Sequence, residues 1–109
     1  MNSDAKKEEI ARKNDLLRQS LAGGKVLLTQ GVQGHDKVDE IIKAVQNFKN
    51  FNEDNDPYGE HDFGSIKDGE MTFFWKIDAY DKKLEYGSPN PADPNVTTRV
   101  LTLMLAEEY

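Results

Sequence analysis

The spacing of apolar residues divides the first half of the chain into two helices and a strand. Residues 4–22 have a sparse apolar stripe, and Gly23-Gly24 ends this predicted helix. Lys25–Gln30 is a short apolar run between glycines, which predicts a buried strand. A loop at residues 31–35 leads into the clearest amphipathic helix, residues 36–51. Its apolar positions recur every three or four residues: Val38, Ile41, Ile42, Val45 and Phe48.

The second half of the chain changes to the two-residue period of a β-strand. Residues 70–81 alternate, so that one face is largely apolar and the other mixed. The apolar face, which we expect to be core, has Met71, Phe73, Trp75, Ile77 and Ala79, and the mixed face has Thr72, Phe74, Lys76, Asp78 and Tyr80. Lys67-Asp68-Gly69 predicts a hairpin turn from a strand that begins at Phe63. Residues 84–86 are expected to form a short return strand.

Two loops and a final helix complete the predicted order. Residues 52–62 and 87–94 are rich in proline, glycine and Asx residues, which form turns. From Thr97 onward apolar residues surround most of a helical circumference, which predicts a buried helix. The expected fold is α+β, with a three- to four-stranded antiparallel or mixed sheet packed by two or three helices, in the order α-β-α-β-β-(β)-α. We expect residues 1–109 to form a single domain, with residues 1–9 as a frayed end of the first helix.

Charge changes this picture, because it is concentrated in one part of the chain. The 109 residues carry 14 basic and 20 acidic side chains, a net charge of −6. No lysine or arginine lies between Lys49 and Lys67, whereas five acids do. Such a segment repels phosphate and attracts cations or basic protein surfaces, so we expect no direct contact with nucleic acid. No apolar run is long enough for a membrane span, and the absence of cysteine and of a signal-like start favours the cytoplasm.

The acidic loop also holds the densest candidate chemistry. Its candidate binding residues are Asp54, Asp56, Tyr58, Glu60, His61 and Asp62. Carboxylates with an imidazole suit a metal ion, although Pro57 and Phe63 stand where an EF-hand needs glycine and glutamate. Alternatively, His61 is a general base oriented by a neighbouring aspartate. The remaining interpretations are a loop in which Asx side chains cap backbone groups, or a contact surface for a partner or ligand.

Further candidates lie outside this loop. Phe74 and Tyr80, beside Lys76 and Asp78, form a contact patch if no helix covers their face, and are core if the final helix covers it. Arg99 is the only basic residue after Lys83. We expect it to form a structural ion pair with Asp78, Asp81 or Asp93, with anion binding as the other interpretation.

Four separated motifs resemble one small family. They are Asn55–Gly64, Phe74–Asp78, Gly87-Ser88-Pro89 with Pro91–Pro94, and Arg99–Thr102 with Leu105–Tyr109. Over about residues 10–109 the chain is similar to the domain of unknown function 3768, with departures at Ala79 and Asn90. The resemblance implies a small alphaproteobacterial protein, often encoded on plasmids or prophages, and it implies no activity, cofactor or catalytic residue. We expect its loop and strand motifs to meet on the side of Arg99.

These observations predict a small acidic binding module without catalytic activity or cofactor. Its expected partner is a protein with a basic surface, such as a host defence protein that a mobile element inhibits. The alternative is a small-ligand-binding or metal-binding domain or a hydrolase that uses Asp56, His61 and Asp62 with Asp78 and Arg99. A mimic of nucleic acid is a third interpretation, for which a net charge of −6 is dilute.

Overall fold

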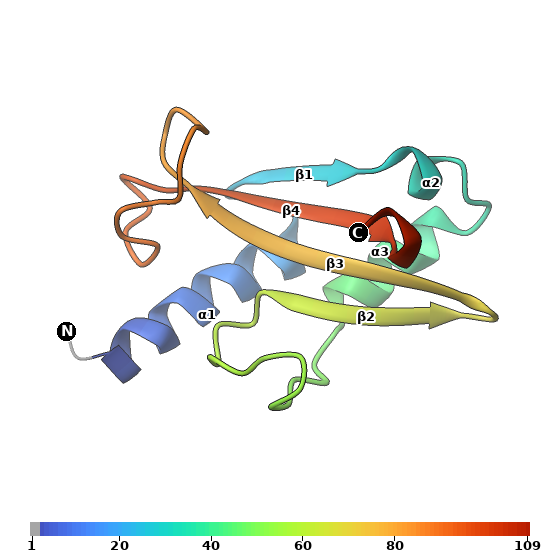
Figure 1. Cartoon of the computed structure of the whole chain (residues 1–109), viewed down its shortest axis with the longest axis horizontal. Helices are drawn as coiled ribbons and strands as arrows, with labels where there is room; N and C mark the ends of the chain where they lie inside the picture. Colours follow the sequence, from blue (N-terminus) through green and yellow to red (C-terminus); the bar gives the residue numbers. More distant parts are fainter. Residues whose placement is uncertain (1–2) are drawn as a thin grey trace.

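A single four-stranded sheet with helices behind it organises the computed structural model, which describes residues 3–109 (Figure 1). The elements in chain order are α1 (Ser3–Ser20), β1 (Lys25–Leu28), α2 (Gln30–Gln33), α3 (Val38–Gln46), β2 (Phe63–Asp68), β3 (Met71–Tyr80), β4 (Thr98–Leu105) and the 3₁₀ turn η1 (Ala106–Glu108). The strand order is β1-β4-β3-β2, with β1 parallel to β4 and the other two pairs antiparallel. This mixed sheet confirms the predicted α+β class.

The predicted final helix is wrong, because residues 98–105 form the strand β4. This strand lies between β1 and β3, where both of its faces are covered over much of its length. Its buried side chains point alternately to the two sides: Arg99, Leu101 and Leu103 to one, Val100 and Met104 to the other. A strand buried on both faces has a continuous apolar run, which periodicity cannot separate from a buried helix.

The predicted buried strand at Lys25–Gln30 is the shorter strand β1, and its burial is wrong, because β1 is at the edge of the sheet and Val26 and Leu27 are exposed. The other differences concern short elements. The predicted return strand at residues 84–86 is wrong, since only an isolated bridge between Tyr80 and Gly87 is present there. The predicted loop at 31–35 contains the single helical turn α2. Helix α3 ends at Gln46, five residues before the predicted end, because Phe48 and Phe51 leave the helix and pack onto Trp75. Their ring centroids lie 5.4 and 6.1 Å from that of Trp75.

The main core lies between the sheet and the two long helices. Trp75 at the centre of β3 is fully buried, and the predicted core face of this strand is therefore confirmed, except that Met71 at its start is exposed. The buried residues packed around it are Leu17, Val32, Ile41, Val45, Phe73, Ile77, Leu101 and Leu103. Gly64 lies opposite Trp75 in β2, where a Cβ atom would meet the indole ring.

The opposite face of the sheet has no α-helix on it in the described chain, as Figure 1 shows with α1 and α3 both behind the strands. A small aromatic cluster covers part of this face. The ring centroids of Phe63 and Phe74 lie 5.2 Å apart, and Tyr109 approaches both rings edge-on. None of the helices within residues 3–109 is both long enough and apolar enough to cross a membrane. The single domain and the frayed end at residues 1–9 stay predictions, and residues 1–2 lie outside the described residues.

Candidate functional site

The loop between α3 and β2 holds its backbone in shape with its own polar side chains. The side-chain oxygen Oδ1 of Asn52 accepts hydrogen bonds from the backbone N–H groups of Asp54 and Asn55, at 2.9 and 3.2 Å. The Asn55 side chain accepts from the N–H of Asn52 at 2.9 Å and donates to the carbonyl of Asn50 at 2.8 Å. In this part of the loop the Asx side chains therefore cap backbone groups, which is one of the interpretations that the sequence left open.

His61 connects the end of this loop to α1. Its Nδ1 lies 2.9 Å from Asp15 Oδ1, and its backbone N–H donates to Asp56 Oδ1 at 3.0 Å. The imidazole stacks on Phe51, with 4.0 Å between ring centroids and 3° between planes. His61 has a φ of 54°, a conformation that few non-glycine residues adopt. The two carboxylates and the stacked ring offset the cost of that conformation and fix the loop against the helix.

Arg18 joins this contact to the core. Its side chain is 2 % exposed and donates to Asp15 Oδ1 at 2.9 Å. The same guanidinium donates to the carbonyls of Val45 and Gln46, at 3.2 and 3.1 Å, at the C-terminal end of α3. Its central carbon lies 5.5 Å from the ring centroid of Phe51 and 5.5 Å from that of Trp75. The hydrogen bonds and the aromatic rings offset part of the cost of burying this charge, whereas the buried Nε has no hydrogen-bond partner among the described residues.

Arg99 has different partners from those predicted. It is buried on the helical side of the sheet, where its Nε donates to Asn14 Oδ1 at 2.8 Å. A second guanidinium nitrogen donates to the carbonyl of Pro91, and Asn14 itself donates to the carbonyl of Glu60 at 2.9 Å. Burial lowers the pKa of Arg99, against the opposing effect of Glu60. The expected ion pair with Asp78, Asp81 or Asp93 is therefore wrong, because Arg99 points to α1.

The anchoring residues Asn14, Asp15 and Arg18 on α1 were missed in the sequence analysis. Asn14 and Arg18 are both buried and lie within the sparse apolar stripe that runs from Ile10 through Leu17 to Leu21. Polar residues that interrupt the buried face of an amphipathic helix need partners. That interruption was the available signal, but the partners are distant in sequence.

The solvent-exposed part of the loop at residues 51–62 contains one aromatic side chain and two acids. Tyr58 is 68 % exposed, and Glu53, Asp54 and Pro57 of the same loop are also exposed. No ion pair in the described part of the chain involves Glu53 or Asp54. These unpaired carboxylates leave the surface of the loop negatively charged.

Two carboxyl groups at the base of the loop have raised pKa values. Burial is the first cause of the raised pKa of Glu60, and the charge of Asp62 is the second. Burial also raises the pKa of Asp62, and the carboxylates of Asp56 and Asp78 add to this effect. Burial, with a smaller contribution from neighbouring acids, therefore disfavours the ionised forms of both carboxyl groups at the base of the loop.

The remaining candidates lie on the helix-free face of the sheet. Phe74, Lys76, Asp78 and Tyr80 alternate with the buried residues of β3 and are half-buried there. Lys76 Nζ lies 2.9 Å from Asp78 Oδ2, so these two charges satisfy each other. In the register of β3 with β4, Ala79 lies directly opposite Arg99, so these two side chains share a face of the sheet. Asp78 is the neighbour of Ala79 along the strand and therefore points to the other face. We expected the loop and strand motifs to meet on the side of Arg99. This expectation is wrong for the motif Phe74–Asp78 on β3, because Asp78 lies on the other face.

The imidazole of His61 lies between two carboxylates of its own chain. Nδ1 contacts Asp15, and Nε2 lies 3.7 Å from Asp56 Oδ2, whose side chain is nearly buried. Within residues 3–109, no three histidine, aspartate or glutamate residues are positioned to hold a metal ion together. His61 therefore acts as a structural link between the loop and α1.

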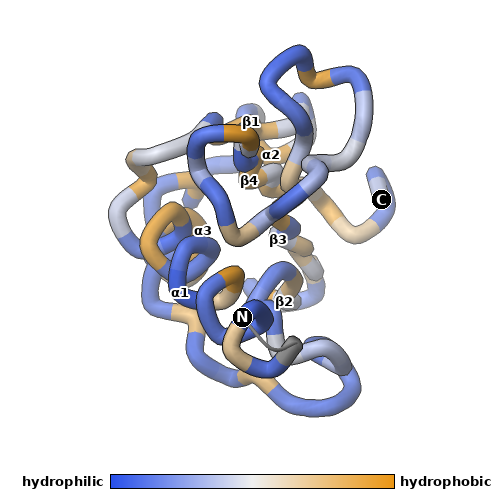
Figure 2. The backbone as a smooth tube through the Cα atoms, turned by 90° about the vertical axis from the view of Figure 1, so that its left-hand side faces the viewer, coloured by the Kyte–Doolittle hydropathy of each residue, from blue (hydrophilic) through white to orange (hydrophobic). Residues whose placement is uncertain are grey.

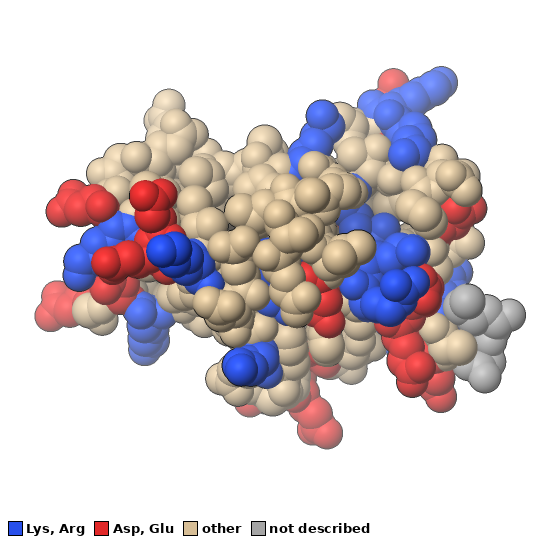
Figure 3. Space-filling model, turned by 180° about the vertical axis from the view of Figure 1, so that it is seen from behind, with Lys and Arg blue, Asp and Glu red and all other residues tan. Residues whose placement is uncertain are grey.

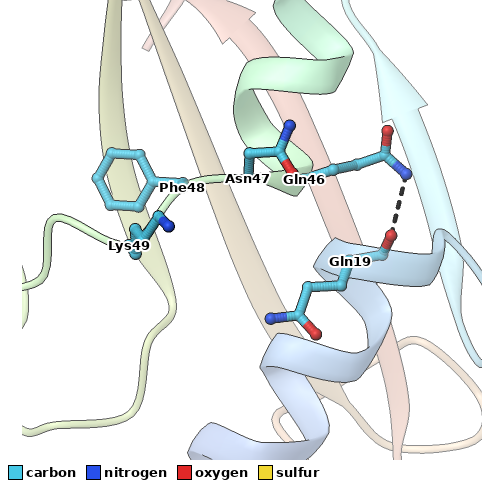
Figure 4. Close-up of a pocket in the computed structure, with 5 residues that line it drawn as sticks. All are labelled: Gln19, Gln46, Asn47, Phe48 and Lys49. Atoms are coloured by element: carbon cyan, nitrogen blue, oxygen red, sulfur yellow. Dashed lines mark hydrogen bonds between the residues drawn. The ribbon is translucent and has the colours of Figure 1, made fainter.

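A separate shallow hollow lies where α1 and α3 end (Figure 4). It has a volume of about 360 Å³ and is lined by Gln19, Gln46, Asn47, Phe48 and Lys49. The Gln46 side chain donates to the carbonyl of Gln19 at 3.0 Å and thereby joins the two helix ends. Its lining consists mainly of amides and one lysine that do not converge on a point, so we assign it no ligand.

The fold and this loop together define a small α+β protein with an acidic loop that is held by internal hydrogen bonds. Residues 28–108 match the family model described as "Protein of unknown function (DUF3768)", and the chain belongs to this family. The match begins at Leu28, so α1 and its anchoring residues precede the matched region. No curated protein and no solved structure matches the chain.

Proposed function

We propose that this protein is a non-enzymatic binding module that uses its acidic loop, residues 51–62, to hold a basic surface of another protein. The observation that carries the proposal is the exposure of Tyr58, at 68 %, on a loop whose backbone is held by internal hydrogen bonds. The unpaired Glu53 and Asp54 beside it supply the charge. Tyrosine is enriched among the residues that contribute most to protein interfaces.

The rigidity of the loop favours binding energetically. Ordering a flexible loop on association costs free energy, and a loop already in its bound shape avoids most of that cost. The carboxylates mainly increase the rate and selectivity of association with a basic partner, whereas the buried contact of an aromatic ring slows dissociation. Tyr58 and the acids beside it therefore have complementary roles.

The proposed partner is a protein of the bacterial host of a plasmid or prophage, in line with the resemblance noted in the sequence. A loop that covers a basic surface blocks whatever that surface otherwise binds, so the expected consequence is inhibition. The helix-free face with Phe74 and Tyr80 extends the contact in this proposal. The enzymatic alternative has less support, because His61 connects the loop to the rest of the fold: its Nδ1 contacts Asp15 on α1 and its ring stacks on Phe51.

Affinity capture from a bacterial lysate with loop variants tests the proposal. We expect one protein to bind the wild type at low salt and to be lost with Tyr58→Ala or with Glu53→Gln/Asp54→Asn. The matched control is Asp36→Asn/Glu107→Gln, which makes the same change of charge at exposed positions outside the loop. Purified, that protein should bind more weakly as salt increases.

Two outcomes contradict the proposal. One is a capture that recovers no protein at low salt with the wild type. The other is a captured protein that the loop variants and the control retain equally, because binding then does not depend on Tyr58 or on the acids beside it.

A further inference from the structure

Strand β1 is one edge of the sheet, and its outer side has backbone groups that no strand pairs with (Figure 1). The N–H of Thr29, directly after β1, donates to the carbonyl of Leu103 on β4 at 3.1 Å. Successive residues of a strand direct their backbone groups to opposite sides, so those of Val26 and Leu28 point away from β4. In agreement, the Gln33 side chain donates to the carbonyl of Leu28 at 2.7 Å. Both backbone groups of Val26 and the N–H of Leu28 therefore face outward, with no further strand of the described chain beside them.

The side chains of this edge are largely apolar and partly in solvent. Val26 and Leu27 are 37 and 52 % exposed. The register with β4 places Val26 on the helical side with Leu101, and Leu27 on the helix-free side. Proteins usually protect such an edge with charges, proline or a covering segment, because it is a template for pairing with another strand. In β1 only Lys25 is charged.

The surroundings of β1 differ in charge from the rest of this acidic chain. No aspartate or glutamate occurs between Asp15 and Asp36, although the 109 residues include 20 acids. Seen from behind in Figure 3, the upper middle of the molecule, over β1, shows no red. Glu108 reaches the end of β1 from the other side of the sheet, where the Thr29 hydroxyl and the Gly31 N–H donate to its carboxylate. Two copies of the chain therefore approach each other at β1 with little repulsion.

The opposite edge, β2, does not offer this. Figure 2 shows β1 at the upper side of the molecule and β2 at the lower side, next to the loop at residues 51–62. The unpaired Glu53 and Asp54 belong to that loop, and β2 itself ends with Lys67 and Asp68. Two copies that met at β2 would bring two acidic loops to one interface, at a cost in repulsion.

We propose that two copies of this chain pair through β1, antiparallel and related by a two-fold axis, so that their sheets become continuous. With the axis at Val26, the Val26 N–H of each copy donates to the Val26 carbonyl of the other. The two Val26 side chains then pack together on the helical side. On the other face, Leu27 of each copy lies against the aliphatic stem of Lys25 of the other copy. This arrangement is self-complementary, because it opposes no like charges and covers both exposed apolar side chains.

The proposal goes beyond the function proposed for the acidic loop. Because β1 and β2 are opposite edges of the sheet, pairing at β1 leaves the loop before β2 free in both copies. The dimer then presents two acidic loops to solvent. A partner with two basic sites is held by both loops at once, which increases its apparent affinity without a new contact.

Sedimentation velocity tests the association. Pairing of strands of four residues buries less area than a permanent dimer needs, so the dimer should depend on concentration. We expect monomers at about 1 µM and mainly dimers at about 500 µM. Leu27→Lys should weaken the dimer at least about tenfold, because the introduced lysine faces Lys25 of the other copy. The matched control is Met71→Lys, at an exposed apolar residue outside β1, which should leave the dissociation constant within about twofold.

A charge-exchange variant tests the register of the pairing. In Lys25→Glu/Leu27→Lys, a glutamate of each copy lies opposite a lysine of the other if the axis is at Val26. This variant should recover most of the association that Leu27→Lys loses. Circular dichroism of all variants checks that each remains folded.

Spin labels locate the interface independently, because the chain has no cysteine of its own. A nitroxide on Lys25→Cys should give a distance of about 20 Å or less between the two copies at high concentration, whereas Lys67→Cys on β2 should give no such short distance.

Three outcomes overturn the proposal. They are a wild type that is monomeric at about 500 µM, a dimer that Leu27→Lys and Met71→Lys retain equally, and a short distance from Lys67→Cys rather than from Lys25→Cys. None of the variants changes the acidic loop, so failure here leaves the function proposed for that loop intact.

Discussion

His61 and Asp15 lie 46 positions apart in the sequence, yet His61 Nδ1 is 2.9 Å from Asp15 Oδ1. This contact joins the end of the acidic loop to α1, and Arg18 continues it to the C-terminal end of α3. The loop is therefore fixed by residues that precede it by some 40 positions, rather than only by its own turns. Its shape, and the presentation of Tyr58, depend on this link.

Replacement of His61 should loosen the loop without unfolding the domain. We choose His61→Asn because asparagine tolerates a positive φ but cannot reach Asp15 in the same way. The loss of one charge-assisted contact and of the stack on Phe51 should lower the free energy of unfolding by about 1–2 kcal/mol. Hydrogen exchange should show faster exchange in residues 52–60, whereas Tyr58→Ala should leave it unchanged. Wild-type protection in His61→Asn would mean that the link does not hold the loop.

The buried pair of Asn14 and Arg99 should behave as one unit. Asn14→Leu leaves the Arg99 Nε without its partner in a buried environment and should cost about 2–3 kcal/mol. The double variant Asn14→Leu/Arg99→Met should cost at least about 1 kcal/mol less than the sum of the single changes, because neither group is then left unpaired. Urea denaturation measures all three. Arg12→Met, on the exposed side of α1, should change stability by less than about 0.5 kcal/mol. If the double variant loses as much free energy of unfolding as the two single variants together, the two side chains are not coupled.

Gly64 should not accept even a methyl group. A Cβ at this position would lie 2.7 Å from Phe48 Cζ and would overlap the indole of Trp75. Gly64→Ala should therefore destabilise the protein by about 1–3 kcal/mol through overpacking, as measured by urea denaturation. Gly87→Ala is the matched control, since its Cβ would meet nothing within 4 Å. Comparable stabilities of the two variants would rule out this account of the packing.

The contribution of Asp62 to the free energy of unfolding should fall as the pH rises. Burial, with Asp56 and Asp78 nearby, raises the pKa of Asp62 in the folded state, so the folded protein binds this proton more tightly than the unfolded chain does. The free energy of unfolding contributed by this group then decreases from about pH 4 upward. Asp62→Asn should be more stable than the wild type at pH 7, by no more than about 1 kcal/mol because the residue is only half-buried.

The gain from Asp62→Asn should shrink toward zero at about pH 3, because this pH lies below the ordinary aspartate pKa of about 3.9 and the carboxyl is then largely protonated in both the folded and the unfolded state. Urea denaturation at both pH values checks this, with Asp54→Asn, an exposed acid of the same loop, as the control. A gain of the same size at both pH values would show that ionisation of Asp62 is not its cause.

Local pattern was sufficient for several elements. The alternation in β3 predicted that Trp75 faces the core, and the spacing in α3 predicted its buried stripe. The Asx residues of the acidic loop predicted turns, which the hydrogen bonds of Asn52 and Asn55 confirm. Each of these features depends on residues close together in the chain.

Candidate residues were predicted less well, because a side chain's partner depends on how the chain folds back. Arg99 was expected to pair with Asp78, Asp81 or Asp93, and it instead reaches Asn14 on α1. Asp78 was expected on the side of Arg99, but the register of β3 with β4 places it on the other face. The role of Asp15 was not predicted, since an aspartate on a charged helix looks like any exposed residue.

The sequence by itself determined the strand and helix periods, the positions of the turns and the concentration of acids in residues 51–62. These are properties of neighbouring residues, and they hold whatever the rest of the chain does. Only the tertiary structure decided that residues 98–105 form a central strand, because an apolar run has no period that separates a strand buried on both faces from a buried helix. It also decided what each polar group on α1 contacts, since hydrogen bonds between residues distant in sequence depend on the packing of the helix against the sheet.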